Sequence, residues 1–99
     1  MAVALSTDLA DPQAIPYFLW DEPMTVLGVR ERLQTASSAE AARLLGKILR
    51  EARDTDVWLF TTPAELALRW SELLPHLGRR RAFWEFLLRR WREEGFLGG

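Results

Sequence analysis

Residues 37–52 read SSAEAARLLGKILREA, and this stretch decides the fold. Its first four residues form a capping box, in which the Ser37 side chain caps the helix and Glu40 follows three residues later. Apolar residues then recur at intervals of three and four, which places them on one face of a helix. They are Ala41, Leu44, Leu45, Ile48, Leu49 and Ala52. The stretch therefore predicts an amphipathic helix, and Gly46 within it indicates close packing against a neighbouring element.

Helices are also predicted before and after this one. Thr25 is an N-cap for a helix over residues 26–35, whose apolar residues have helical spacing. Residues 62–74 begin with an N-cap threonine, a proline at the first helical position and a glutamate at the third, so they predict a helix that Pro75 ends. In residues 54–60, two aspartates end the central helix, and the short apolar connector that follows is left open as strand, turn or helix.

A last helix is predicted from Arg79 or Arg81 to Glu94, because Gly95 is a natural C-terminal stop. The connections between the four helices are short, as they are in compact bundles. The sequence thus predicts an all-α fold, a small four-helix domain with orthogonal or bundle-like packing over residues 15–97.

The N-terminal part of the chain has a different character. Residues 1–14 show no apolar periodicity and contain Asp11-Pro12, which breaks a helix, so we expect a mobile, extended arm. Residues 15–23 carry two prolines around a dense apolar cluster, which favours an extended or turn conformation held on the core. We expect three aromatic side chains of this cluster to be largely buried: Tyr17, Phe18 and Trp20.

Length and composition bound the class of protein. The chain has 99 residues and a mass of 11.4 kDa, which suits one small domain. It contains no cysteine, which excludes disulfides, cysteine zinc sites and thiol catalysis. No run of apolar residues approaches the roughly 18 that a membrane span needs. Residues 1–10 lack the basic start of a signal peptide, so we expect a cytoplasmic protein.

No group of residues predicts catalysis. His76 is the only histidine, and no serine, threonine or aspartate stands in the same short segment to form a nucleophile pair with it. Gly28, Gly46 and Gly78 stand alone, so none of them predicts a phosphate-binding loop. The acidic residues of 54–56 lack the spacing of calcium loops and suit a helix end. We expect no enzyme activity, no metal and no cofactor.

The last helix carries more apolar residues than one buried face holds. They spread over an arc of roughly 200°: Phe83, Trp84, Phe86, Leu87, Leu88 and Trp91. In the preceding helix, Leu68 points away from the other leucines. We expect residues 16–20 to cover most of this arc. For the part left over, we expect Trp84 or Leu88, together with Leu68, to lie on the surface and to contact a protein partner.

Charge is distributed unevenly along the chain. The formal net charge is −1, yet residues 1–29 hold four acidic and no basic residues, whereas residues 79–92 hold six arginines and one glutamate. Arg79, Arg80 and Arg81 fall at the start of the last helix, where cations oppose the helix dipole. Since local stability does not account for them, we expect them to pair with the acidic arm, to bind an acidic partner surface or to contact phosphates.

Four stretches carry a family resemblance when they are taken in order: Pro16-Tyr17-Phe18-Leu19-Trp20-Asp21, residues 45–53, Asp56-Val57-Trp58 and Phe83-Trp84-Glu85. Across residues 16–91 the chain resembles a group of short bacterial and archaeal proteins. These are often encoded immediately upstream of an AbiE-type nucleotidyltransferase, the toxin of an abortive-infection toxin–antitoxin system. The resemblance implies an antitoxin-like partner of that toxin. The Gly-Ser and paired metal-binding aspartates of the nucleotidyltransferase itself are absent from this sequence.

The functional hypothesis is therefore a non-enzymatic, protein-binding module. Its predicted partner-binding residues are Arg79, Arg80, Arg81, Trp84, Leu88 and Leu68. Two alternatives stay open, which are a small DNA-binding regulator that uses the same arginines and a homodimeric structural protein. The slightly negative net charge argues against nucleic acid as the partner, and so does the lack of a helix with an uninterrupted basic and polar face.

Overall fold

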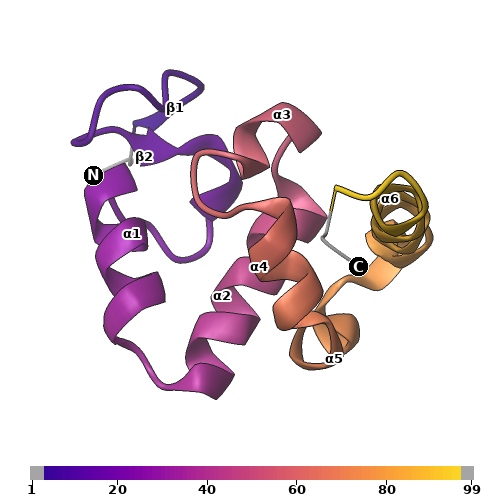
Figure 1. Cartoon of the computed structure of the whole chain (residues 1–99). Coiled ribbons are helices and arrows are strands. Elements are labelled where there is room, and N and C mark those ends of the chain that lie inside the picture. Colours follow the sequence, from indigo (N-terminus) through magenta and orange to yellow (C-terminus); the bar gives the residue numbers. More distant parts are fainter. Residues whose placement is uncertain (1–3, 97–99) are drawn as a thin grey trace.

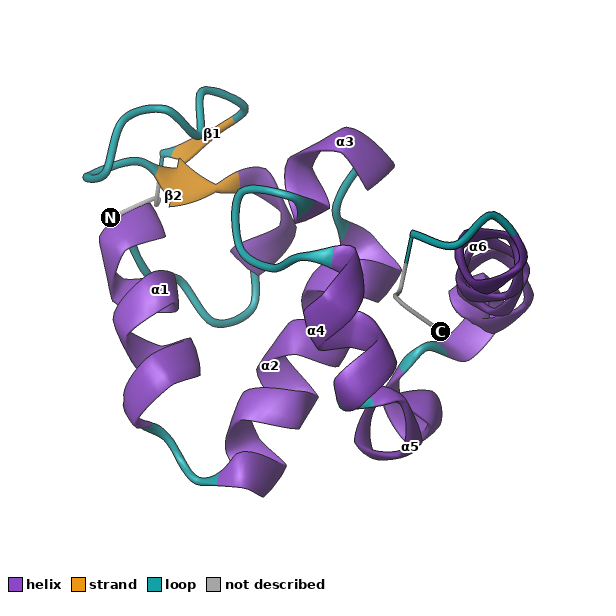
Figure 2. Ribbon diagram, in the orientation of Figure 1, coloured by secondary structure: helices purple, strands orange, loops and turns teal. Residues whose placement is uncertain are grey.

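The computed structural model describes residues 4–96, and these residues are mostly helical (Figures 1 and 2). In chain order the elements are β1 (Leu5–Ser6), β2 (Ile15–Pro16), η1 (Tyr17–Leu19), α1 (Val26–Thr35), α2 (Ser38–Glu51), α3 (Asp54–Val57), α4 (Pro63–Leu68), α5 (Trp70–Leu73), η2 (Leu74–His76), η3 (Gly78–Arg80) and α6 (Arg81–Glu93), where η marks a 3₁₀ turn. The predicted all-α class is confirmed at this level, with a two-stranded parallel sheet added near the N-terminus.

Helix α2 lies at the centre and contacts α1, α3, α5, η2 and η3 (Figure 1). The predicted cap is present, because the Ser37 hydroxyl accepts a hydrogen bond of 3.2 Å from the Glu40 amide. The apolar residues predicted for its inner face are all buried. Gly46 is buried as well, and a methyl group in its place would overlap Cβ of His76. The interpretation of Gly46 as a close-packing residue is therefore confirmed, with η2 as the neighbour.

The first and last predicted helices also agree with the structure. The Thr25 hydroxyl caps α1 by accepting from the Gly28 amide at 3.0 Å. Helix α6 ends at Glu93, and Gly95, two residues later, turns the chain away with a φ of +80° that is easily reached only by glycine. The Phe96 amide then donates back to the Trp91 carbonyl at 2.9 Å, which completes a Schellman ending.

The helix predicted over residues 62–74 is divided in the structure. It begins at Pro63 as expected, but α4 ends at Leu68. The backbone leaves helical geometry at the next residue, Arg69, and α5 and η2 follow. The Arg69 side chain donates to the Ser38 carbonyl at 3.0 Å and to Glu72 at 3.3 Å. The tertiary bond to Ser38 and the local bond to Glu72 together hold the bend in place. Residues 54–56, predicted to end the central helix, and Val57, left open between strand, turn and helix, together form the one-turn helix α3.

The segment over residues 1–14, predicted as an extended arm, is part of the fold from residue 4 onward. Leu9 is buried in the core, and Leu5–Ser6 pairs with Ile15–Pro16. The amide of Leu27 donates to the Pro12 carbonyl at 3.0 Å, which ties the segment to α1. Residues 4–14 therefore pack against the helices instead of standing apart. The mobility of this segment stays a prediction, and its first three residues lie outside the described part.

Residues 15–23 are held on the core, but the prediction for Trp20 is wrong. Phe18 is buried and Tyr17 is half-buried, whereas the Trp20 side chain is 68% exposed. Leu19 takes the interior position beside it, and Asp21 is paired with Lys47 on α2. These two neighbours fix the backbone so that the indole points outward.

Lys47 is a buried cation that the sequence analysis did not single out. Its ammonium donates to the Asp21 carboxylate and lies 3.6 Å from Glu22. Arg43, one turn earlier, binds Glu22 at 3.2 Å and Glu40 at 2.7 Å. The hydrogen bond from Lys47 lowers the pKa of Asp21. This charge network joins the loop of residues 20–25, which carries Trp20, to α2.

Candidate protein-binding surface

The three predicted arginines lie together where η3 meets α6, but they differ in surroundings. Arg80 is half-buried and donates to the Asp54 carboxylate of α3 at 2.9 Å. Its guanidinium lies 4.5 Å from the centre of the Phe83 ring and 5.9 Å from that of Trp84. The hydrogen bond from Arg80 also lowers the pKa of Asp54. Arg80 therefore ties α6 to α3, which is a structural role.

Arg79 and Arg81 are exposed. Arg81 donates to Glu85 one turn further along α6 at 2.8 Å, and both side chains are about half exposed. Within residues 4–96, Arg79 forms no ion pair. The partners of this cluster are thus Asp54 and Glu85, which belong to α3 and α6, and the predicted pairing with the acidic N-terminal segment is not found there. Two exposed cations remain at the start of α6.

Two of the predicted contact residues, Trp84 and Leu88, are buried, so the prediction that either lies on the surface is wrong. Trp84 is 1% exposed and Leu88 is 3% exposed. The indole Nε1 of Trp84 donates to the Leu49 carbonyl of α2 at 2.9 Å, and its ring packs edge-on against Trp58 and Phe83. A buried indole needs a partner for its N–H, and this carbonyl provides it. Trp84 therefore anchors α6 to the core.

The apolar excess of α6 lies on its other side, at Phe86. This ring is 49% exposed, and the guanidinium of Arg89 lies 6.0 Å from its centre. Trp84 and Phe86 are two residues apart and so about 200° apart around the helix. This spacing is visible in the sequence, and it indicates that Trp84 and Phe86 cannot both face the core. We call Arg79, Arg81, Phe86 and Arg89 the η3–α6 surface.

Leu68 is exposed, as predicted. Its side chain is 85% exposed, the highest value among the large apolar residues of the described chain. Leu66, two residues earlier on α4, is buried, so the helix turns Leu68 outward. The structure therefore places Arg79, Arg80 and Arg81 together where η3 meets α6, and Leu68 is exposed on a different element, α4.

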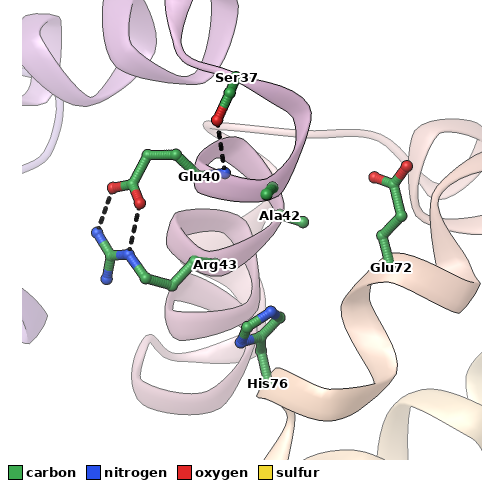
Figure 3. A pocket seen from close by; sticks show the side chains of 7 residues that line it. Ser37, Glu40, Ala42, Arg43, Glu72 and His76 are labelled. Carbon is green, nitrogen blue, oxygen red and sulfur yellow. Dashed lines mark hydrogen bonds and ion pairs between the residues drawn. The ribbon is translucent and has the colours of Figure 1, made fainter.

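A groove of about 600 Å³ lies between the start of α2 and the η2 region (Figure 3). Both carboxylates of the groove already have partners: Glu40 binds Arg43, which also lines the groove, and Glu72 binds Arg69 and the Ser38 hydroxyl. His76 and Glu72 project from the side facing α2 (Figure 3). The Ser37 hydroxyl is engaged as a helix cap. This arrangement shows no nucleophile aligned with a base, and the expectation of no enzyme activity stays a prediction.

Residues 4–96 contain no group of three or more histidine or acidic side chains positioned to hold a metal ion. None of the helices in that range is both long and apolar enough to cross a membrane. Comparison of the chain with protein-family models, with curated proteins and with solved structures finds no match. The site must therefore be interpreted from its own chemistry.

Proposed function

We propose that the protein is a non-enzymatic, protein-binding module that docks its partner on the η3–α6 surface. In this proposal the partner is a neighbouring nucleotidyltransferase toxin, which the family resemblance implies, and the chain acts as an antitoxin-like protein in the cytoplasm. The buried residues Trp84 and Leu88 are replaced as contact residues by Phe86 and Arg89.

One observation carries the proposal, namely the two-sided character of α6. Its inner side is fixed to the core through the hydrogen bond from Trp84 to Leu49. Its outer side presents Phe86 and exposed arginines. Aromatic residues and arginine are enriched in protein interfaces and in their hot spots. A firmly anchored helix that exposes such residues offers a partner a preorganised surface.

The test is co-purification with the product of the neighbouring nucleotidyltransferase gene. We expect the double variant Arg79→Glu/Arg81→Glu to weaken the complex by about tenfold or more, because both substitutions place like charges against an acidic partner surface. The matched control is Arg30→Glu/Arg32→Glu on α1, which makes the same change in net charge on the opposite side of the molecule (Figure 1). Equal binding by both variants would remove the arginines from the proposal.

Leu68 is tested separately by Leu68→Ala. Since its side chain is already exposed, we expect the fold to tolerate this change. Weaker capture of the partner would extend the docking surface to α4, and unchanged capture would confine it to η3 and α6.

Two measurements address the alternatives. A gel-shift assay with promoter DNA that shows binding falling steeply with salt would favour the DNA-binding regulator. Light scattering that gives about twice the chain mass at micromolar concentration would favour the homodimer. We expect neither result.

A further inference from the structure

The unpaired cations of the chain's C-terminal third gather on and beside α6. Arg80, Arg81 and Arg90 are taken up by Asp54, Glu85 and Glu94. Three other arginines form no ion pair within the described residues: Arg79, Arg89 and Arg92. All three are exposed. Among the described residues, this end of the molecule therefore keeps three exposed arginines without a carboxylate partner.

The outer side of α6 has the geometry of a helix-docking seam. Ala82, Phe86, Arg89 and Glu93 are all exposed and follow one another at intervals of four, three and four residues. Such spacing aligns side chains along one side of a helix, which is where a second helix packs. Ala82 leaves space one turn before the Phe86 ring. In Figure 1, α6 lies at the edge of the molecule.

We infer that this seam takes an acidic, amphipathic helix of the partner protein. An apolar side chain of the partner packs beside Phe86 in the space above Ala82, and carboxylates of the partner pair with Arg79, Arg89 and Arg92. This inference rests on the proposed function and specifies the chemistry of the partner. Arginine suits the role because its planar guanidinium binds carboxylates through two parallel hydrogen bonds.

The composition of the seam favours a protein over a nucleic acid. Glu85, Glu93 and Glu94 stand on or at the end of the same helix as the arginines, and they would repel a phosphate backbone. Phe86 occupies the middle of the seam, where a polar reading face would be required for DNA. Carboxylates arranged along an amphipathic helix can instead pair with individual arginines and leave the partner's apolar stripe on Phe86.

The probes are two fluorescein-labelled helical peptides of about 18 residues that share one leucine stripe. One carries glutamate on its flanks and the other carries lysine. Fluorescence anisotropy with the full chain measures binding. We expect the glutamate peptide to bind, the lysine peptide not to bind, and the affinity to fall as salt rises. Phe86→Ala and Arg79→Glu/Arg89→Glu should each weaken binding about tenfold or more, while Arg30→Glu/Arg32→Glu leaves it unchanged.

The inference is overturned if the glutamate peptide does not bind, if both peptides bind equally, or if duplex DNA displaces the glutamate peptide. Unchanged binding by Phe86→Ala or by Arg79→Glu/Arg89→Glu overturns it as well. Thermal unfolding of each variant shows that its fold is intact. Failure here is distinct from failure of the proposed function. If the nucleotidyltransferase co-purifies and is lost with Arg79→Glu/Arg81→Glu, but the glutamate peptide does not bind, the surface is right and the acidic helix is wrong. If no nucleotidyltransferase co-purifies, the proposed function itself fails.

Discussion

The molecule contains two clusters of cations, and they are used in opposite ways. On α2, Lys47 and Arg43 are paired with Asp21, Glu22 and Glu40. Around α6, several arginines stay exposed and without carboxylates among the described residues. A buried cation needs a partner because its desolvation costs free energy, whereas an exposed arginine is already solvated. The first cluster therefore stabilises the fold, and the second is available for binding.

The largest expected loss of stability comes from removing the contact that attaches α6 to α2. Trp84→Ala removes a buried indole and its hydrogen bond to the Leu49 carbonyl. We expect it to lower the free energy of unfolding by about 3–5 kcal/mol. The control, Phe86→Ala, alters an exposed ring on the same helix and should cost about 0.5 kcal/mol or less. Urea denaturation measures both, and similar losses would contradict the division of α6 into an anchoring and an exposed side.

The next effect concerns the tight contact between α2 and η2. Gly46→Ala places a methyl group against Cβ of His76. We expect overpacking to cost about 1–3 kcal/mol, which exceeds the gain in helix propensity of up to about 1 kcal/mol. A double-mutant cycle with His76→Gly should show that the cost of Gly46→Ala shrinks once the His76 side chain is gone. A stabilised Gly46→Ala protein would contradict the close approach.

Acid unfolding tests whether the pair of Lys47 and Asp21 stabilises the fold. The hydrogen bond from Lys47 lowers the folded pKa of Asp21 below its usual 3.8. This carboxylate therefore stabilises the fold above pH 3.8, and its contribution is lost as the pH falls through the folded pKa. We expect Asp21→Asn to be less stable at neutral pH and to lose part of this acid dependence. Chemical denaturation between pH 2 and pH 7 tests it, and an unchanged profile would contradict the pairing.

Asp54→Asn is the matching variant for the cluster around α6. The hydrogen bond from Arg80 lowers the pKa of Asp54, as the hydrogen bond from Lys47 lowers that of Asp21. We expect Asp54→Asn to lose part of the decrease in unfolding free energy that occurs as the pH falls below 3.8, the usual pKa of Asp54. Together, Asp21→Asn and Asp54→Asn show how much of the pH dependence of the unfolding free energy comes from the α2 charge network and how much from the ion pair between α3 and η3.

The smallest expected effect is that of Arg79→Gln. Its side chain is exposed and forms no ion pair within residues 4–96. We expect the free energy of unfolding to change by about 0.5 kcal/mol or less, whereas capture of the partner weakens. Urea denaturation and co-purification measure the two effects. A large loss of stability would place Arg79 in the same structural class as Lys47.

The helices that sequence analysis could predict are those with local signals. Ser37 and Thr25 cap α2 and α1 through hydrogen bonds to amides three residues away, so the pattern alone identifies them. The bend at Arg69 could not be predicted, because it is held by the carbonyl of Ser38, distant in sequence. Leu9 likewise enters a core that forms only when the helices assemble.

The candidate site could be predicted only in part, because some of its residues are placed by contacts with residues distant in the sequence. The arginine cluster is visible in the sequence, as is the outward direction of Leu68. The apolar arc of α6 did not reveal which side would be enclosed. That choice depends on the Leu49 carbonyl, which accepts the indole N–H of Trp84 and turns Phe86 outward. Arg80 could not be assigned a structural role before its contact with Asp54 was known.

The graded exposure of the tryptophans gives this protein its own optical reporters. Trp84 is 1% exposed, Trp58 39% and Trp20 68%. Indole fluorescence shifts to longer wavelengths when water surrounds the excited ring, and dissolved quenchers reach exposed rings first. Iodide should therefore quench the red-shifted emission of exposed indoles such as Trp20, while the blue-shifted emission of buried indoles such as Trp84 persists. Variants in which Trp20 or Trp84 is replaced by phenylalanine assign each component to its residue.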